Sequence, residues 1–462
     1  MVPVAPTLLD RVAASAAERF LWDRRASVRV TDLLLGTALG GRRAALAGRS
    51  VIIATSSQLT AALALIELDG AARRLTILPP DTSAEHVSEL IVRAEADAVV
   101  TDEATPANSA FDALLRVVCV SSVRGTEEAA PPHMKTEWLL LTSGTSGVPK
   151  LVAHTLASLA APIGAASRPD VTPVWGTFYD IRRYGGLQIF LRAMVGATSL
   201  VLSSAGEPIA DHLTRLGRHG VTHLTGTPSH WRRALMSPEI RKIAPRYVRL
   251  SGEIADQAVL DSLRAAFPEA AVGHAFASTE AGVAFEVNDG FAGFPASYLA
   301  EVRNGVEMRA VDGALHIRSR RTASRYVGDN QPSLLDAAGF VDTGDMIEPR
   351  GDRYIFAGRK GGIINVGGQK IHPEEIEAVI NQHPQVRMSL VRARKNPVTG
   401  AVVTADVVLR DEGARTNAEA EIGNDILAHC REALPRHKVP AAIKFVPSLD
   451  VAATGKLSRR YG

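Results

Sequence analysis

The chain contains 462 residues, more than a single hydrophobic core usually serves, so its length predicts at least two domains. Hydrophobic residues make up 46% and charged residues 22%, and the 52 basic and 49 acidic side chains leave a net charge of only +3. This balance is ordinary for a globular protein. It excludes the strongly basic surface by which many proteins bind nucleic acids or membranes.

The sequence also predicts a cytoplasmic protein. Residues 1–20 carry Asp10 and Glu18 and lack the apolar run of a signal peptide. No apolar stretch approaches the ~20 residues that a membrane span needs. Cys119 and Cys430 lie far apart, without the spacing of a metal site, as expected of buried thiols in a reducing compartment.

Before residue 138, short apolar runs alternate with helical patterns. The expected strands are 51–54, 75–78, 98–101 and 117–120, and the expected helices are 8–20, 58–68 and 84–94. Strands separated by helices are typical of an α/β sheet with helices on both faces.

The most informative stretch runs from Trp138 to Lys150. An apolar run predicts a buried strand, which leads into a loop of hydroxyl and glycine residues closed by a lysine. Such a loop suits a polyphosphate, because glycines permit close backbone approach, hydroxyls donate hydrogen bonds and Lys150 supplies a positive charge. The spacing matches neither a Walker loop nor a nucleophile elbow, and a polar surface turn is the simpler alternative. The candidate loop residues are Thr142, Ser143, Gly144, Thr145, Ser146 and Gly147.

This stretch resembles the phosphate loop of the adenylate-forming superfamily, which includes acyl-CoA synthetases, peptide-synthetase adenylation domains and luciferases. It departs from the family pattern only at Ser146 and Leu151. Four more family motifs follow in the correct order, and the chain is identified as a member. The resemblance implies an α/β fold, with a large N-terminal domain of stacked sheets and a β-rich subdomain, and a small mobile α+β C-terminal domain. The expected divisions are 1–358, a hinge at 359–362, and 363–462.

By the same resemblance, residues 175–231 help to form the wall of an acyl pocket. Asp180 stands near the place where the family commonly has a histidine, beside two arginines. It either forms an ion pair with Arg182 or Arg183 or contacts the substrate. Core packing is the alternative for Trp231. The predicted pocket residues are Tyr179, Asp180, Tyr184, Gly185, Trp231 and Gly273.

Two further segments resemble the nucleotide-binding part of the family. A strand at 247–250 leads to a turn where the family contacts adenine, and 271–280 resembles the YGxTE segment. The resemblance implies that Thr279 donates to the α-phosphate and that Glu280 holds Mg²⁺. Taken alone, these two residues would be explained as the start of a helix. The predicted adenine-site residues are Ser251, Gly252, Glu253, Ala275 and Phe276.

Alternating residues around Asp312-Gly313 predict a hairpin in a β-rich subdomain. Beyond it, Asp345 resembles the family's ribose-binding aspartate and Arg359 its arginine that contacts ribose and phosphate. The hinge position, usually Asp or Lys, is Gly361, and glycine permits large backbone rotations. Gly367 and Gly368 lie where the family's loop approaches the pantetheine arm.

In the C-terminal part we expect a helix from Pro373, strands at 386–391 and 402–409, a helix at 418–434 and a strand at 443–446. The final segment resembles the family's terminal PxTGKxxR motif. By this resemblance, Lys456 stabilises the carboxylate and the α-phosphate during adenylation. By itself, such a lysine would be a solvated charge.

Together the motifs imply an AMP-forming ligase that activates a small-molecule carboxylic acid with ATP and Mg²⁺ and transfers the acyl group to coenzyme A. An aryl or medium-chain acid is preferred over a long fatty acid. No membrane span or nucleic-acid partner is expected, and a homodimer is allowed. The predicted catalytic residues are Lys456, Lys150, Thr279, Glu280 and Arg359.

Two alternatives stay open. The enzyme could load a separate acyl carrier protein or pass the adenylate to an amine. The chain could also be an adenylate-binding regulator that has lost turnover, which the glycine hinge favours and the retained catalytic motifs oppose.

Overall fold

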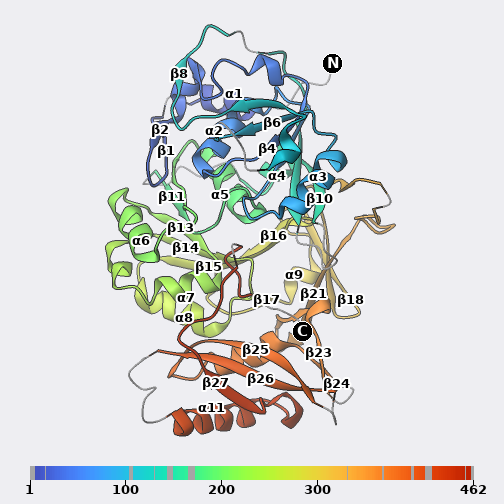
Figure 1. Cartoon of the computed structure of the whole chain (residues 1–462). Helices are drawn as coiled ribbons and strands as arrows, with labels where there is room; N and C mark the ends of the chain where they lie inside the picture. Colours follow the sequence, from blue (N-terminus) through green and yellow to red (C-terminus); the bar gives the residue numbers. More distant parts are fainter. Residues whose placement is uncertain are drawn as a thin grey trace.

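The computed structural model describes residues 6–15, 17–103, 108–128, 131–142, 149–164, 172–329, 331–366, 369–396, 400–410, 419–452 and 454–458. In Figure 1 a large body built from the N-terminal three quarters of the chain stands above a small domain coloured orange and red. This arrangement confirms the predicted α/β fold with a large N-terminal and a small C-terminal domain. No helix in the described part of the chain has the length and apolar content to cross a bilayer.

A seven-stranded sheet in the described residues has the order β20-β10-β9-β5-β4-β6-β7. Its strands are β4 (Ser50–Ile53), β5 (Arg74–Ile77), β6 (Ala98–Thr101), β7 (Leu115–Val118), β9 (Glu137–Thr142), β10 (Lys150–Thr155) and β20 (Arg325–Val327). Helices α2 (Gln58–Leu68) and α3 (Ala84–Arg93) connect parallel strands. Every residue of α2 is buried, as expected of a helix enclosed on all sides.

An eight-stranded sheet, again counted over described residues, has the order β16-β15-β14-β13-β11-β12-β1-β2. Its strands are β1 (Phe20–Trp22), β2 (Ser27–Arg29), β11 (Val174–Thr177), β12 (Ser199–Val201), β13 (His223–Gly226), β14 (Tyr247–Ser251), β15 (Ala271–Ser278) and β16 (Gly282–Val287). The accompanying helices are α1 (Leu8–Ala13), α4 (Leu156–Ala160), α5 (Tyr184–Val195), α6 (Ile209–Arg218), α7 (Pro228–Ala234) and α8 (Gln257–Ala266). Side chains of β14 alternate: Val248 and Leu250 join one core, while Tyr247 packs against the core that contains α5.

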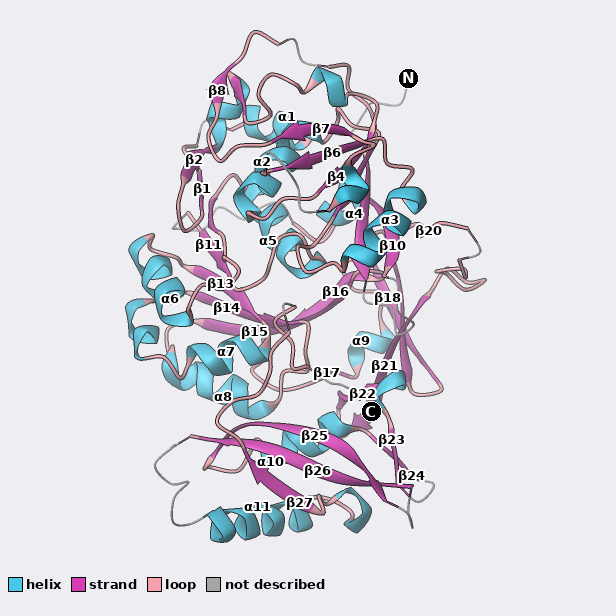
Figure 2. Cartoon of the chain, in the orientation of Figure 1, coloured by secondary structure: helices cyan, strands magenta, loops and turns pink. Residues whose placement is uncertain are grey.

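The third sheet has the order β17-β22-β21-β19-β18 and forms the β-rich part of the large domain (Figure 2). The elements here are β17 (Phe294–Pro295), α9 (Ser297–Ala300), β18 (Val306–Val311), β19 (Ala314–Ser319), β21 (Val341–Arg350) and β22 (Arg353–Arg359). The predicted hairpin is confirmed, because β18 and β19 pair antiparallel around Asp312 and Gly313, both with positive φ. A small pair, β3 (Gly36–Thr37) and β8 (Arg124–Gly125), lies apart.

The described residues of the small domain form a separate core and two sheets, β23-β24 and β25-β26-β27. Its elements are β23 (Ile364–Val366), β24 (Gln369–Ile371), α10 (Pro373–Ile380), β25 (Val386–Asn396), β26 (Gly400–Leu409), α11 (Glu419–Ala433) and β27 (Ala442–Phe445). The predicted helix start at Pro373 is confirmed, with Glu374 and Glu375 in the first turn.

The predicted helix over 8–20 is wrong in its second half. Helix α1 begins at a Thr7 capping box and ends at Ala13. Phe20 starts β1, which pairs with β2 and with β12. Sheet pairing with residues far along the chain overrides the local helical pattern here.

Candidate active site

The ends of the candidate phosphate loop are held directly opposite one another. Thr142 is the last residue of β9 and Lys150 the first of β10, and the two are partners in the antiparallel ladder. The Lys150 ammonium lies 4.7 Å from the centre of the Tyr326 ring, on the neighbouring strand β20. Ser143, Gly144, Thr145, Ser146 and Gly147 lie outside the described residues.

Thr279 and Glu280 occupy the tight turn between β15 and β16, not the start of a helix. The Thr142 hydroxyl donates a hydrogen bond of 2.9 Å to Glu280 Oε1. No hydrogen bond from another described residue reaches Glu280 Oε2, which leaves this oxygen available to a ligand. The turn therefore joins the base of the phosphate loop to a free carboxylate oxygen.

His154 also holds this turn, and sequence reasoning missed it. Its Nε2 lies 2.7 Å from the Thr279 carbonyl oxygen, and its Nδ1 lies 3.2 Å from the Ser158 hydroxyl. Burial lowers the pKa of His154 to about 4, so the ring is neutral at neutral pH and donates through Nε2. A single histidine in a buried strand has no local signal of such a role. Tyr326 was missed for the same reason.

Asp345 and Arg359 are ladder partners on β21 and β22, with Arg359 Nε 3.6 Å from Asp345 Oδ1. Arg359 also donates to the Thr343 carbonyl at 3.0 Å. Burial raises the pKa of Asp345, and the charges of Arg359 and Lys456 oppose this rise. The structure thus brings together three residues that the sequence predicted as nucleotide or catalytic groups.

Lys456 reaches this place from the other end of the chain. In Figure 1 the red C-terminal segment rises out of the small domain toward the β15 region. A Cβ built on Gly252 would lie 3.6 Å from Lys456 Cε, so the lysine passes directly over the turn after β14. Solvent still reaches the side chain, yet desolvation by the surrounding protein lowers its pKa, opposed by Glu253 and Asp345.

The turn after β14 anchors the C-terminal segment. Glu253 accepts hydrogen bonds from Leu457 N at 2.8 Å and from Ser229 N at 2.9 Å, one on each carboxylate oxygen. The Thr227 hydroxyl donates to the Gly455 carbonyl at 2.6 Å. These contacts fix the backbone on both sides of Lys456. Adenine contact by Ser251, Gly252 and Glu253 stays a prediction.

Two predicted adenine residues lie on β15 beside this turn. Ala275 is the ladder partner of Ser251. The Phe276 ring stacks on Phe356 at 5.2 Å and on Phe285 at 5.8 Å between centroids. The aromatic stack holds the Phe276 ring in a defined orientation.

The predicted pocket residues do not all face the same space. Tyr179 donates from its hydroxyl to the Ser251 carbonyl at 2.8 Å and lies beside the active-site turn. Tyr184 is buried at the start of α5, and Gly185 is exposed next to the Tyr179 ring.

Trp231 and Gly273 depart from their predicted place on a pocket wall. Trp231 is fully buried in the core, where its ring makes edge contacts with Phe178 and Phe267. A Cβ on Gly273 would lie only 1.9 Å from the Asn288 amide oxygen, so a protein side chain already fills the space beside this glycine. The Trp231 ring, whose Nε1 donates to the Arg249 carbonyl at 3.5 Å, and the absence of a side chain at Gly273 both serve packing within the protein.

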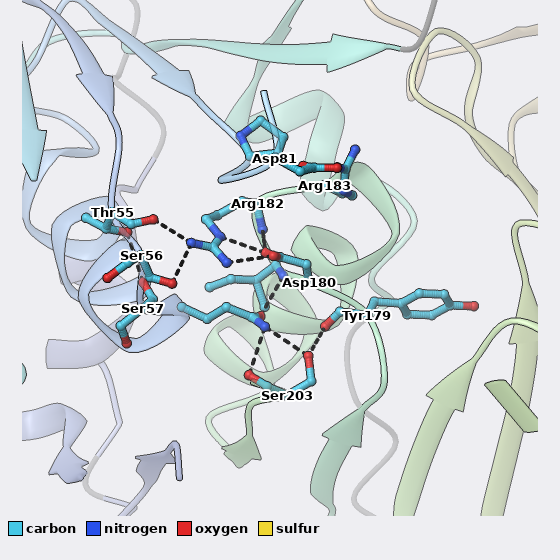
Figure 3. A network of polar contacts seen from close by, with 12 residues as sticks. Thr55, Ser56, Ser57, Asp81, Tyr179, Asp180, Arg182, Arg183 and Ser203 are labelled. Carbon is cyan, nitrogen blue, oxygen red and sulfur yellow. Dashed lines mark hydrogen bonds and ion pairs between the residues drawn. The ribbon is translucent and has the colours of Figure 1, made fainter. Parts of the chain in front are cut away.

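Asp180 forms a two-pronged ion pair with Arg182 (Figure 3). Its Oδ1 accepts from Arg182 N and Nε at 2.8 Å each, and its Oδ2 accepts from Nη2 at 2.7 Å. Arg182 is 1% exposed and also donates to the carbonyls of Thr55 and Ser56. In Figure 3 the Tyr179 ring points away from this pair. The geometry favours a structural role for Asp180, which joins the loop before α5 to the loop after β4.

We expect Asp180→Ala to lower the free energy of unfolding by about 3 kcal/mol while leaving the preference among acids unchanged, because it strands a buried guanidinium. Chemical denaturation and relative kcat/KM over an acid panel would measure the two effects. Asp81→Ala is the matched control: Asp81 pairs with Arg183 and is 44% exposed. Asp81→Ala should lower the free energy of unfolding by at most about 1 kcal/mol. A changed acid preference in Asp180→Ala would instead support substrate contact.

Near the predicted hinge, the short helix η5 (Lys360–Gly362) follows β22. Lys360 forms an ion pair with Asp342 at 2.7 Å, and both side chains are more than 40% exposed. The role of Gly361 as a pivot stays a prediction. Gly367 and Gly368 lie outside the described residues.

A large α/β domain and a small α+β domain that meet at these motifs define the fold of adenylate-forming enzymes. The sequence profile of the AMP-binding enzyme family matches residues 45–327, more than half of the chain, and that of the AMP-binding enzyme C-terminal domain matches residues 375–456. The chain belongs to the AMP-binding enzyme family.

Curated relatives are similar at low identity. The mitochondrial acyl-coenzyme A synthetase ACSM1 of Homo sapiens is 31% identical over 29% of this chain, a match that spans 24% of that protein. The acyl-CoA ligase ppsA of Aspergillus oryzae is 27% identical over 70% of this chain and 61% of its own length. Among solved structures, the anthranilate CoA ligase AuaEII in complex with anthranoyl-AMP aligns with a TM-score of 0.81 over 99% of this chain and 96% of that one, at 18% identity. The last comparison shows a shared fold.

Proposed function

We propose that the chain is an AMP-forming acid–thiol ligase, which activates a carboxylic acid with ATP and Mg²⁺ and transfers the acyl group to coenzyme A. The position of Lys456 carries this proposal. Its side chain enters from the small domain and lies over Gly252, within electrostatic range of Asp345 and Arg359. Aryl or medium-chain acids are the proposed substrate class, since the site is bordered by Tyr179 and a compact aromatic core.

In the first step, a carboxylate oxygen attacks the α-phosphorus of ATP and pyrophosphate leaves, so negative charge builds up on phosphate oxygens. Lys456 would stabilise this charge from one side, and Lys150 with the Thr279 hydroxyl from the other. Arg359 and Asp345 would orient the ribose. No protein nucleophile takes part.

Glu280 fits a magnesium ligand, because its Oε2 has no hydrogen-bond donor among the described residues while Oε1 is fixed by Thr142. The described residues contain no group of three or more metal-binding side chains. This suits Mg²⁺, which is usually held by one or two carboxylates and the substrate phosphates. When bound, the ion would neutralise phosphate charge.

For the second step the small domain would rotate about residues 359–362, so that a thiol could reach the acyl carbonyl and displace AMP. The Lys360–Asp342 pair that joins this segment to β21 is exposed, and exposed ion pairs contribute little free energy. Breaking this ion pair during the rotation would therefore cost little free energy.

Pyrophosphate release with ATP, Mg²⁺ and a panel of aryl, medium-chain, long-chain and amino acids tests the function, with and without coenzyme A. We expect sustained turnover only with coenzyme A and with aryl or medium-chain acids. A single burst without turnover would point to a carrier protein or an amine as acceptor. Nucleotide binding without pyrophosphate release from any acid would favour a regulator.

A further inference from the structure

A second group of charged residues lies on the face of the eight-stranded sheet that α5 covers. Arg249 of β14 is 4% exposed, and Arg192 of α5 and Glu286 of β16 lie within electrostatic range of it. Burial, together with the charge of Arg249, lowers the pKa of Arg192 to about 10. Two guanidinium groups thus share one nearby carboxylate.

Neither guanidinium group is fully satisfied by the protein. Arg249 Nε lies 3.7 Å from Glu286 Oε2, too far for a hydrogen bond, and the Nε atoms of Arg249 and Arg192 are buried without a hydrogen-bond partner. No side chain or backbone carbonyl of another described residue accepts a hydrogen bond from either side chain. Glu286 Oε1 is occupied by the Tyr247 hydroxyl. A buried guanidinium group is costly when its donors are unbonded and its counter-ion is shared, so a carboxylate from a bound molecule would explain both arginines.

Arg321 provides the contrast within the same region. Both Arg249 and Arg321 lie within electrostatic range of Tyr184. The Arg321 guanidinium, however, donates to the carbonyls of Val283, Ala284 and Asn304. Backbone carbonyls thus bind the Arg321 guanidinium. The Arg249 guanidinium donates no hydrogen bond to a backbone carbonyl of the described residues.

The position of Arg249 relates it to the candidate active site. It precedes Ser251 by two residues on β14, so both side chains lie on the same face of the sheet. Tyr179 donates to the Ser251 carbonyl, and Lys456 lies over Gly252. A strand rises about 3.3 Å per residue, so the Cα of Arg249 lies about 7 Å from the Cα of Ser251, the last residue of β14, next to the turn over which Lys456 lies.

We propose that Arg249, assisted by Arg192, binds a second carboxylate of the substrate acid. The preferred substrate is then a dicarboxylic acid, whose activated carboxylate lies at Lys456 and whose second carboxylate is several bonds away across an aromatic or short aliphatic spacer. This inference rests on the proposed function, because it names the substrate of the same site.

Calorimetric titration in the presence of a non-hydrolysable ATP analogue tests it without requiring turnover. Matched pairs of aryl and aliphatic acids are compared, in which one member has a second carboxylate and the other a methyl group of similar size. We expect the wild type to bind the diacid about 10- to 100-fold more tightly. In Arg249→Met this ratio should fall to about 1 while the Kd of the nucleotide analogue is unchanged. Arg264→Met, on the exposed face of α8, is the control and should retain the wild-type ratio.

Equal binding of the two acids by the wild type, or an unchanged ratio in Arg249→Met, would overturn the proposal. Should Arg249→Met fail to fold, the proposal is still tested by the ratio of diacid to methyl-acid affinity in the wild type and in Arg192→Met. Arg192 is only partly buried. Pyrophosphate release from the same acid pairs separates the two claims. Turnover of the methyl-bearing acids alone would contradict only the diacid assignment. Absence of turnover from every acid would contradict the proposed ligase while the binding ratio still tests Arg249.

Discussion

Lys456→Ala is expected to lower the rate of acyl-adenylate formation by about 100- to 1,000-fold, which is the usual effect of removing one charge-stabilising donor from a transition state. The same variant should convert a presynthesised acyl-adenylate and coenzyme A to the thioester within a few-fold of the wild-type rate. The physical reason is that Lys456 lies within electrostatic range of Glu253, Asp345 and Arg359 in this arrangement of the domains, which the proposed rotation for the second step would change. Stopped-flow pyrophosphate release and thioester formation measure the two half-reactions separately.

The pH dependence provides an independent readout. The ammonium form of Lys456 is the one that stabilises phosphate charge, and its lowered pKa means that this charge is lost at a lower pH than in a lysine without neighbouring protein groups. Adenylation should therefore decline on the alkaline side, and Lys456→Ala should lack this decline. Equal loss of both half-reactions in Lys456→Ala would contradict the assigned role.

Gly455→Ala is expected to reduce adenylation by about 100-fold and to spare thioester formation from presynthesised adenylate. Gly455 has a φ of +75°, and a Cβ there would lie 1.9 Å from His230 Cε1. The His230 ring cannot easily move, since it stacks on Phe178 and bonds to Thr227. Left-handed backbone strain of about 1–2 kcal/mol and overpacking of about 1–3 kcal/mol together disfavour the docked segment. Each 1.36 kcal/mol costs about tenfold in rate.

Gly351→Ala is the matched control for Gly455→Ala. Gly351 also has a positive φ, of +63°, but an added Cβ would meet nothing within 4 Å. It should leave both half-reactions within about threefold of wild type, since only the backbone strain is shared. A similar loss of adenylation in the two variants would mean that the contact with His230 is unimportant.

The motifs predicted to contact the nucleotide could be found in the sequence because each is short and contiguous. The Thr142–Lys150 stretch, the Thr279-Glu280 pair, Asp345 and Lys456 carry their chemistry in a few adjacent residues, and their order along the chain added weight. The structure bonds Thr142 to Glu280 and brings both Glu280 and Lys456 within electrostatic range of Asp345. The supporting residues His154 and Tyr326 were missed, since their partners lie about 125 and 175 residues away along the chain.

Several predicted pocket residues have a different environment in the structure from the one the sequence implied. Asp180, Trp231 and Gly273 were assigned by position in the family pattern, yet Asp180 pairs with Arg182, Trp231 belongs to the core, and Asn288 fills the space at Gly273. The sequence left the Asp180–Arg182 ion pair and the core packing of Trp231 open as alternatives, and it could not choose between them because burial decides each outcome. Arg249 likewise has no distinguishing feature in the sequence. Its burial and the unbonded Nε atom are found only in the structure.

By itself, the sequence indicated an α/β fold through its hydrophobic pattern and at least two domains through its length, because both are properties of the chain alone. The motifs predicted to contact the nucleotide were assigned by their resemblance to a family. Only the tertiary structure decided which charges satisfy one another and which do not. It paired Asp180 with Arg182, placed Lys456 over Gly252, and left Arg249 and Arg192 with one shared carboxylate. The energy of a charge depends on its burial and on the acceptors within about 3 Å of it, and both are set by residues distant in sequence.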